Sequence, residues 1–391
     1  MLSTLAVAHY RSINQLVMPL GRLNLITGPN GSGKSNLYKA LRLLAETAQG
    51  GVVNALAREG GLDSTFWAGP EAISRRMLSG EVPVQGGGPR KKVSRLRLGF
   101  AAEDFSYAIS LGLPEPPPPM NLSAFALDPE IKRECIWAGA AYRRASLLVD
   151  RAGPMIRARE GRGWDVLAQH TPTFDSLFDQ VGSLRGSPEV LMLREHIRGW
   201  RFYDHFRTDA EAPARRTQIG TRTPVLHHDG RDLPAALQTI VEIGDPEALH
   251  QAISDAFPGC TLKISAELGG HFAVEFYQHG LLRPLSAAEL SDGTLRYLLL
   301  VAALLTPRPP TMMVLNEPET SLHPDLLPAL ARLIILASQR CQVWVVSHAS
   351  RLIAALEQDP ECNAIRLQKT LGQTEIVGQG ILDEPVWHWP D

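Results

Sequence analysis

The chain has 391 residues, enough for about two or three domains with cores of their own. Its 39 Lys and Arg nearly balance 41 Asp and Glu, giving a formal net charge of −2, and 44% of its residues are hydrophobic. This composition is that of a globular chain. It excludes collagen-like, disordered and coiled-coil-dominated classes, and it gives no support for a protein that binds nucleic acid over its whole surface.

The first part of the chain, residues 1–113, is predicted to be the N-terminal part of an α/β head. Apolar patterns over residues 2–8 and 23–27 predict strands, and the second of these ends at a glycine. Leucines at helical spacing predict a helix over residues 34–47. A hairpin is predicted over residues 93–113.

The middle part, residues 114–283, is predicted to be a compact α+β insertion or lid. It begins with a proline run at residues 114–119, which neither a helix nor a central strand accommodates. No heptad pattern continues over three or four repeats, so we expect no long coiled coil. The predicted elements are strands over residues 146–150 and 155–159, helices over 189–199 and 233–241, and a hairpin over 262–277.

The last part, residues 284–391, shows the clearest alternation of strands and helices. An apolar helix is predicted over residues 290–305, and buried strands over residues 312–315 and 343–346 flank an amphipathic helix over residues 326–336. Such alternation predicts a mostly parallel sheet with helices on its faces. The predicted fold class is therefore α/β, with a two-lobed head that also contains antiparallel strands.

Cysteine spacing and hydropathy bear on the compartment. The four cysteines form no CxxC pair, which excludes a short-range zinc knuckle and argues against a disulfide scaffold. The longest apolar stretch, residues 297–305, is far shorter than the ~20 residues that cross a bilayer. Residues 1–10 lack the basic start of a signal peptide. We expect a cytoplasmic protein without a membrane partner.

A phosphate-binding loop is the strongest signal in the sequence. Residues 28–35, GPNGSGKS, match the pattern GxxxxGK followed by Ser or Thr, with a predicted strand before them and a predicted helix after them. Glycines let the backbone wrap around phosphate oxygens, and the start of a helix attracts an anion. Lys34 is expected to reach the β- and γ-phosphates, and Ser35 to hold Mg²⁺. The loop predicts that the chain binds a nucleoside triphosphate.

A carboxylate for hydrolysis is predicted where the strand over residues 312–315 ends. Asn316 and Glu317 follow that strand, and Glu317 is the candidate for the residue that positions and activates water. The alternative is that Glu317 only forms the turn before Pro318. Glu319 could supply a second carboxylate near the metal, but a solvated turn residue is the favoured interpretation.

Two further elements narrow the class of protein. Residues 290–294, LSDGT, open an apolar helix, so Ser291 and the N–H groups of Gly293 and Thr294 are predicted to bind an anion. Taken alone, these residues also fit an ordinary N-cap. His348 follows the next buried strand and is predicted to lie at the edge where ligands bind in such folds, although a structural histidine fits as well.

Together these motifs resemble the ABC-type ATPases of the RecF and SMC group, and among them the bacterial RecF-like predicted ATPases of the AAA family. The matches occupy about residues 1–70 and 284–350 and follow the order of the family. The segments that carry the resemblance are residues 28–35 as the Walker A loop, 290–294 as the signature motif, 314–317 as Walker B, 320–324 as the D-loop region, His348 as the switch histidine, and 9–13 (HYRSI) as the N-terminal segment.

The resemblance implies an enzyme that converts ATP and water to ADP and phosphate, with ATP and Mg²⁺ as cofactors. It implies a head-to-tail homodimer that encloses two ATP molecules, in which each Walker A loop faces the signature motif of the other copy. Residues 114–283 would then be an insertion between two lobes of one head.

The resemblance also assigns roles to individual residues. Catalysis is assigned to Glu317, His348 and Lys34, and the metal to Ser35 and Asn316. Nucleotide binding is assigned to Gly28, Pro29, Asn30, Gly31, Ser32, Gly33, Lys34, Ser35, Asn36 and Arg11; the signature acting in trans is Ser291, Asp292, Gly293 and Thr294; the D-loop contains Ser321 and His323.

Three positions depart from the pattern of the group. Asn316 stands where Walker B usually carries Asp; its amide can bind metal-bound water but adds no negative charge, so metal affinity or turnover is expected to be weak. No glutamine fits a Q-loop, and Gln85 is a poor candidate. Asp292 places a carboxylate close to the expected phosphate, so it must point away or serve the dimer interface.

Binding of nucleic acid is a weaker inference. Three short basic stretches could neutralise phosphates, but they fit solvated surfaces equally well. Trp137, Trp164 and Trp200 do not alternate with basic residues in a stacking pattern. The cluster at residues 227–229, HHD, is more typical of a polar loop than of a metal site. The basic stretches are residues 90–97, 143–144 and 215–216.

The favoured function is an ATPase that acts by ATP-driven dimerisation in DNA repair or maintenance, with double-stranded DNA as a partner. The alternative is an ATP-gated sensor or regulatory subunit for a separate effector protein, for example in phage defence, which Asn316 favours. An ATPase subunit of a membrane transporter fits less well, because the insertion separates the Walker A loop from the signature motif.

Overall fold

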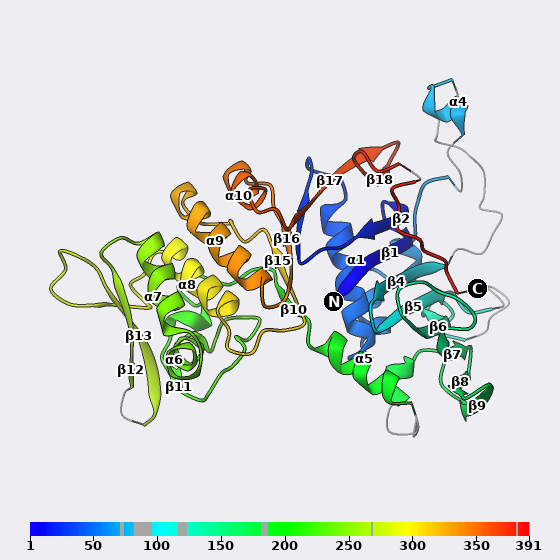
Figure 1. The fold of residues 1–391 in the computed structure, drawn as a ribbon, viewed down its shortest axis with the longest axis horizontal. Coiled ribbons are helices and arrows are strands. Elements are labelled where there is room, and N and C mark those ends of the chain that lie inside the picture. The colour runs from blue at the N-terminus through cyan, green and yellow to red at the C-terminus, as the bar shows by residue number, and fades with distance from the viewer. Residues whose placement is uncertain are drawn as a thin grey trace. The chain divides into compact units, whose positions relative to one another are not determined.

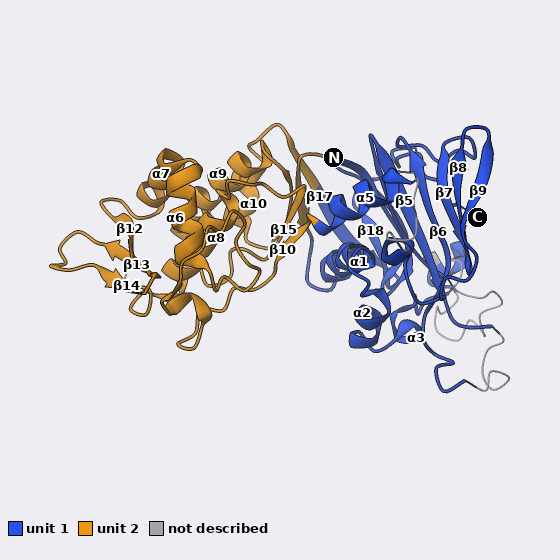
Figure 2. Cartoon of the chain, turned by 90° about the horizontal axis from the view of Figure 1, so that it is seen from below, with its two compact units in different colours: residues 1–20, 28–198, 365–391 blue, residues 21–27, 199–364 orange. Residues whose placement is uncertain are grey.

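The structure is a computed structural model, and Figure 1 shows its helices and strands in chain order. It describes residues 1–70, 74–81, 95–115, 123–180, 187–266, 269–380 and 382–390. The chain forms two compact units (Figure 2): unit 1 contains residues 1–20, 28–198 and 365–391, and unit 2 contains residues 21–27 and 199–364.

Unit 1 is built on an eight-stranded antiparallel sheet in the order β2-β1-β4-β5-β6-β7-β8-β9. Helix α1 packs against β1 and β4, which are buried along almost their whole length. The strands are β1 Leu2–Tyr10, β2 Ile13–Pro19, β4 Leu96–Ala102, β5 Phe105–Gly112, β6 Glu130–Ala138, β7 Leu147–Ala152, β8 Met155–Glu160, β9 Gly163–Ala168 and β18 Gln373–Ile376; the helices are α1 Lys34–Thr47, α2 Val52–Arg58, α3 Leu62–Thr65, α4 Arg75–Leu78 and α5 Pro188–Arg198.

Unit 2 contains a parallel sheet in which β10, β15, β16 and β3 are neighbours in that order. Helix α8 is apolar and buried on nearly all sides, and it packs against α6 and α9. The strands are β3 Leu23–Thr27, β10 Arg201–Tyr203, β11 Gln218–Ile219, β12 Thr261–Ala266, β13 His271–Tyr277, β14 Leu285–Ser286, β15 Met312–Asn316 and β16 Gln342–Val346; the helices are α6 Leu233–Ile243, α7 Pro246–Ala256, α8 Asp292–Leu304, α9 Leu327–Ser338 and α10 Ser350–Leu356; β17, Cys362–Thr370, runs from unit 2 into unit 1.

The α/β fold class predicted from the sequence is confirmed. The strand over residues 23–27 and the helix over residues 34–47 coincide with β3 and α1. The two predicted buried strands of the last part are β15 and β16, which pair in parallel with Leu315 opposite Val345. Hydrophobic periodicity, together with the glycines at the ends of elements, was sufficient to predict these strands and this helix because each of them buries a continuous apolar face.

The sequence did not predict the hairpin that opens the chain. Strand β2 follows β1 after a reversal in which Tyr10 pairs with Ile13, and both His9 and Arg11 have positive φ, 60° and 50°. Hairpin reversals of this kind usually use Gly, Asn or Asp. Because none of these residues stands here, the sequence carries no local signal of the turn.

The predicted division at residues 113 and 283 stays a prediction; the two compact units divide the chain elsewhere. The helices within the described part of residues 114–283 have at most 11 residues, in keeping with the absence of a long coiled coil. Several predicted features lie outside the described residues: the start of the strand at residue 93, the prolines at 116–119, Gln85 and the basic residues 90–92.

Candidate functional site

The phosphate loop has backbone geometry that only glycine accepts at two positions. Gly28 and Gly33 have φ of 144° and 108°. A Cβ atom on Gly28 would lie 2.4 Å from the Leu367 carbonyl oxygen, and one on Gly33 would lie 2.1 Å from Thr374 Oγ1. Helix α1 begins directly after Gly33, so its first N–H groups border the loop. The loop is therefore shaped by its glycines and by the last strands of unit 1.

Lys34 closes the loop on itself. Its Nζ donates hydrogen bonds to the carbonyl oxygens of Gly28, at 2.6 Å, and Pro29, at 3.1 Å. Both acceptors are neutral, so an anion that binds in the loop would gain the full charge of the ammonium group. Ser35, predicted to hold the metal, is exposed.

A buried chain of hydroxyl groups supports the loop from behind. Thr374 Oγ1 donates to the carbonyl oxygen of Ser32 at 2.9 Å and lies 2.7 Å from Ser12 Oγ. Asn36 Nδ2 donates to the same Ser12 oxygen at 2.8 Å. The structure thus gives partners within the protein to the Asn36 side chain and to the Ser32 carbonyl oxygen, and the contact of both residues with a nucleotide stays a prediction.

Arg11 is held by a carboxylate of the same unit. Its Nη2 and Nε donate to Glu59 Oε2 at 2.7 and 3.1 Å, and Tyr10 Oη donates to the same oxygen at 2.6 Å. Burial, followed by this hydrogen bond, raises the pKa of Tyr10 well above its ordinary value. The predicted role of Arg11 in nucleotide binding would require it to share or leave this ion pair.

Asn316 and Glu317 lie at the carboxyl edge of the parallel sheet. Strands β3, β15 and β16 run in the same direction, so their ends meet at this edge, and the phosphate loop continues directly from the end of β3. The Glu317 N–H donates to the Val346 carbonyl oxygen at 2.8 Å, and Glu317 has a φ of 48°. Its half-exposed carboxylate is thereby held on a strained backbone at the edge where ligands bind in such folds.

The interpretation of Glu319 as a solvated turn residue is wrong. Its side chain is only 6% exposed, and Oε1 accepts hydrogen bonds from Ser347 Oγ at 2.7 Å, His348 N at 2.9 Å and Ala349 N at 3.2 Å. Glu319, the single acceptor, lies 28 to 30 residues before its three donors along the chain, so the local sequence gives no sign of its burial. Glu319 holds the turn that carries the predicted switch histidine.

The imidazole of His348 lies beside both carboxylates. Its Nδ1 is 3.6 Å from Glu317 Oε1 and 3.5 Å from Glu319 Oε1. The structure therefore brings two of the predicted catalytic residues, Glu317 and His348, into reach of each other.

Ser291 caps helix α8. Its Oγ accepts a hydrogen bond from Thr294 N at 3.1 Å and lies 2.8 Å from Thr294 Oγ1. A Cβ atom on Gly293 would lie 2.8 Å from the carbonyl oxygen of Ser321, so the start of α8 and the predicted D-loop approach each other too closely for a larger residue. Ser321 has a φ of 65°. The predicted signature and the predicted D-loop thus lie in close contact within unit 2.

The second predicted D-loop residue, His323, is exposed and caps a short 3-10 turn. Its Nδ1 accepts a hydrogen bond from the Asp325 N–H at 3.3 Å and lies 3.4 Å from the Asp325 carboxylate. Its imidazole is thus free of the core and follows the D-loop on the surface of unit 2.

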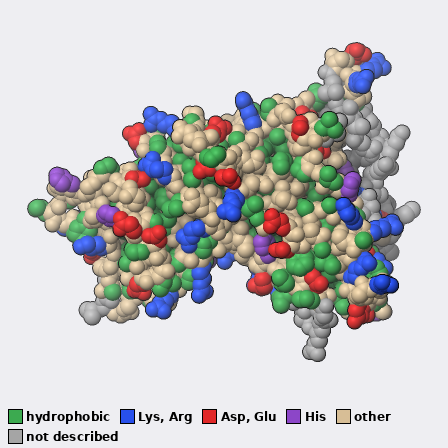
Figure 3. Space-filling view, viewed as in Figure 1, with side chains coloured by type: hydrophobic (Ala, Val, Ile, Leu, Met, Phe, Trp, Pro, Cys, Tyr) green, Lys and Arg blue, Asp and Glu red, His purple; other side chains and the backbone are tan. Residues whose placement is uncertain are grey.

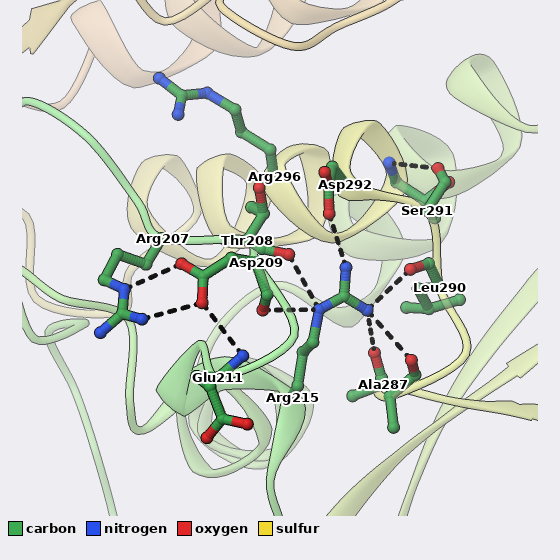
Figure 4. A network of polar contacts seen from close by, with 12 residues as sticks. Arg207, Thr208, Asp209, Glu211, Arg215, Ala287, Leu290, Ser291, Asp292 and Arg296 are labelled. Carbon is green, nitrogen blue, oxygen red and sulfur yellow. Dashed lines mark hydrogen bonds and ion pairs between the residues drawn. The ribbon is translucent and has the colours of Figure 1, made fainter.

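Two arginines around α8 were not assigned to the site by the sequence. Arg215, predicted as part of a basic surface patch, has a side chain that is only 9% exposed and pairs with Asp292 at 2.7 Å (Figure 4). Arg296 is buried, and its Nη2 donates to the carbonyl oxygen of Glu317 at 3.3 Å. Burial lowers the pKa of Arg296. Only the three-dimensional structure brings these side chains to the site.

The remaining basic residues give a limited surface for phosphates. On the face drawn in Figure 3, Lys and Arg are interspersed with Asp and Glu. Trp164 does not alternate with basic residues along the sequence, but Arg159 pairs with it across β8 and β9, and the guanidinium groups of Arg157 and Arg159 lie 5.4 and 5.9 Å from its ring. Cross-strand neighbours of this kind are distant in the linear pattern.

The cluster at residues 227–229 is a hydrogen-bonded turn. His227 Nδ1 lies 2.7 Å from Asp229 Oδ1, and Arg231 Nη2 lies 2.9 Å from His227 Nε2. His227, His228 and Asp229 are close enough together to hold an ion, but both ring nitrogens of His227 already have partners. Among the described residues, no helix has the length and hydropathy that crossing a membrane would require.

The site defines a class of protein. A glycine-shaped phosphate loop follows strand β3 of a parallel sheet, a histidine follows the neighbouring strand β16, and a glutamate follows β15, the strand beyond it. A serine caps an apolar helix beside the predicted D-loop. This is the arrangement of a P-loop ATPase of the ABC type. The chain belongs to the family described as "AAA domain, putative AbiEii toxin, Type IV TA system", which matches residues 23–110 and 168–354.

Solved structures agree with this assignment at the level of the fold. An SMC head bound to the C-winged helix domain of ScpA has a TM-score of 0.51 and 12% identity, and the match covers 97% of this chain and 98% of that one. An SMC head domain with a coiled coil and joint from Pyrococcus yayanosii has a TM-score of 0.51, 10% identity and 98% coverage of both chains. No curated protein matches. The resemblance to the RecF and SMC group is thereby confirmed.

Proposed function

We propose that this chain binds ATP with Mg²⁺ and hydrolyses it slowly through a head-to-tail homodimer. The observation that carries the proposal is the phosphate loop, in which Gly28 and Gly33 adopt backbone angles and close contacts that no other residue accepts. Such a loop presents N–H groups and the ammonium of Lys34 to phosphate oxygens. Ser35 and Asn316 would hold Mg²⁺, which would neutralise phosphate charge.

Each remaining residue has one task in this reaction. Glu317 orients the attacking water and accepts its proton, and the neighbouring His348 holds the carboxylate in place or contacts the γ-phosphate. Ser291, Gly293 and Thr294 contact the γ-phosphate that is bound by the other copy. Since Asn316 carries no charge, the metal is held less tightly than by Asp, and turnover is slow.

Two biological settings fit this cycle. In the first, ATP-driven dimerisation clamps double-stranded DNA for repair or maintenance, and the half-buried arginines beside Trp164 contribute to a surface for its phosphates. In the second, ATP gates a separate effector protein and hydrolysis is incidental. Asn316 favours the second setting, as does the description of the family as a putative toxin of a type IV TA system.

The experiment is steady-state ATP hydrolysis with Mg²⁺, with and without duplex DNA, for the wild type, Lys34→Ala and Glu317→Gln. Lys34→Ala should lose ATP binding, and Glu317→Gln should bind ATP but lose turnover. Unchanged ATP binding by Lys34→Ala would refute the site. Stimulation by DNA supports the clamp, and tight binding with negligible turnover that is indifferent to DNA supports the sensor.

A separate variant tests dimerisation. Ser291→Arg places a long side chain where the phosphate of the other copy should dock, so turnover and ATP-dependent dimerisation should disappear while each monomer still binds ATP. Light scattering with and without ATP measures the dimer. Normal hydrolysis by Ser291→Arg would refute the head-to-tail arrangement.

A further inference from the structure

The signature segment, residues 287–294, contains an electrostatic conflict. Helix α8 begins at Asp292, and the start of a helix carries partial positive charge that attracts an anion. A carboxylate next to Ser291 would repel a phosphate at the same place. For Ser291 and Gly293 to receive a phosphate, the charge of Asp292 must be balanced and its side chain must be held aside.

Arg215 meets both requirements (Figure 4). Its Nη2 donates to Asp292 Oδ1 at 2.7 Å. Its Nη1 donates to three backbone carbonyl oxygens of the turn before α8, those of Leu290 at 2.7 Å, Ala287 at 3.1 Å and Ala288 at 3.2 Å. One guanidinium group therefore holds the turn and the first residue of the helix together.

The arginine is itself anchored from the opposite side. Its Nε donates to the carbonyl oxygens of Thr208 at 2.9 Å and Asp209 at 3.1 Å. Ala212 and Ala214, on the same short segment, are fully buried. Arg207 donates two hydrogen bonds to Asp209, at 2.8 and 2.9 Å, which fixes the loop that supplies these carbonyl groups.

The charges in this cluster determine whether the start of α8 still attracts an anion. Five of the six acceptors of Arg215 are neutral carbonyl oxygens, so the only formal charge that it meets among them is that of Asp292. The Asp292 side chain is 61% exposed, whereas that of Arg215 is 9% exposed. A rigid, largely buried cation therefore compensates a carboxylate at the surface, and the N–H groups at the start of α8 keep their attraction for phosphate.

We propose that Arg215 is the positioning residue of the signature motif. Arg215 fixes the turn at residues 287–290 and draws the Asp292 carboxylate aside. Ser291 and Gly293 can then receive the γ-phosphate that is bound by a second copy of the chain. This inference rests on the proposed ATP-driven dimer. Arg215 touches no reacting atom, and its effect is exerted through the geometry and the charge of the signature segment.

The first test compares Arg215→Ala and Arg215→Lys with Arg216→Ala. Arg216 is the matched control, because it is the next residue, is largely exposed and pairs with Glu211 on the surface. Arg215→Ala should lower kcat about 100-fold, the order of loss that a misplaced group causes. ATP binding to the monomer should stay unchanged, because the phosphate loop is intact. Arg215→Lys should not restore kcat, because an ammonium group cannot replace the planar fork.

The second test separates charge from structure. Adding Asp292→Asn to Arg215→Ala removes the carboxylate that Arg215 no longer balances, so kcat should recover about tenfold relative to Arg215→Ala alone. The single variant Asp292→Asn completes the cycle of four proteins, and the coupling between the two residues is calculated from it. Thermal unfolding of all four proteins shows that each is folded at the assay temperature.

The outcomes distinguish this inference from the proposed function. A wild-type protein that neither dimerises with ATP nor hydrolyses it refutes both. Wild-type turnover together with full activity of Arg215→Ala refutes the positioning role alone. A folded Arg215→Ala that loses activity without recovery in the double variant refutes the charge compensation and leaves Arg215 as an ordinary structural contact.

Discussion

Replacing Glu319 by alanine removes one acceptor from three donors at once. Glu319 Oε1 accepts from Ser347 Oγ, His348 N and Ala349 N, and the side chain is almost fully buried. After the replacement the Ser347 hydroxyl can rotate, and Ala349 N keeps a second acceptor in Ser347 Oγ at 3.1 Å. The amide of His348 is then the donor that is left without a partner.

The expected loss of stability follows from these three hydrogen bonds. A buried donor without a partner costs about 1–3 kcal/mol, and a hydrogen bond to a charged acceptor contributes about 1.5–3 kcal/mol. Since two of the three donors recover in part, we expect Glu319→Ala to lower the free energy of unfolding by about 3 kcal/mol. Glu319→Gln keeps a carbonyl acceptor and should lose less than about 1 kcal/mol.

Urea denaturation followed by circular dichroism measures both variants. Glu317→Gln is the matched control, because the same chemical change is made on a half-exposed carboxylate and should alter stability by less than about 0.5 kcal/mol. ATP turnover of folded Glu319→Ala should also fall, since His348 is no longer held beside Glu317. Equal stability of the alanine and glutamine variants would refute the view that this carboxylate acts as a hydrogen-bond acceptor.

Three further predictions concern other parts of the molecule. Gly33→Ala places a Cβ atom 2.1 Å from Thr374 Oγ1, whereas nothing lies within 4 Å of a Cβ atom on Gly31. The affinity for ATP, measured by calorimetry, should therefore fall more for Gly33→Ala than for Gly31→Ala. Equal losses would contradict the role of Thr374. Glu134→Ala leaves the fully buried Arg151 without its carboxylate, and urea denaturation should show a loss of about 3–5 kcal/mol; a loss below about 1 kcal/mol would contradict this. Burial raises the pKa of Asp204 from 3.8 to about 6, so the folded protein binds the proton more tightly and this contribution to stability is lost as pH rises through that interval. Asp204→Asn should therefore stabilise the protein more near neutral pH than near about pH 4, by about 1 kcal/mol after allowance for solvent screening, and a pH-independent effect would count against this assignment.

The sequence predicted those parts of the site that are local in the chain. The phosphate loop, Asn316 and Glu317 were found because each follows a short apolar strand and consists of consecutive residues. Sequence-based prediction missed the contacts between residues that are far apart along the chain. Arg215 and Asp292 are 77 residues apart, and Thr374 and Ser32 are 342 residues apart. No periodicity reports such contacts, because they depend on how the sheets bring separate segments together.

The burial of Glu319 was predicted wrongly, and the cation–π contacts of Trp164 were not predicted, for the same reason. A glutamate after a proline in a turn is usually solvated, and here the donors that bury it come from the turn after β16. The tryptophan meets its arginines through strand pairing between β8 and β9. Pairing register in an antiparallel hairpin is set by the turn and the covered face, which a single sequence specifies weakly.

The support of the phosphate loop by β18 has a consequence for the order of synthesis. The ribosome makes residues 28–35 long before Leu367 and Thr374, whose atoms bound the loop at Gly28 and Gly33; Ser32 and Thr374 are 342 residues apart. A nascent chain that stops before β17 and β18 has the complete motif in its sequence but lacks the wall that shapes it. The loop can therefore take this shape only after β17 and β18 have been made and have packed against it.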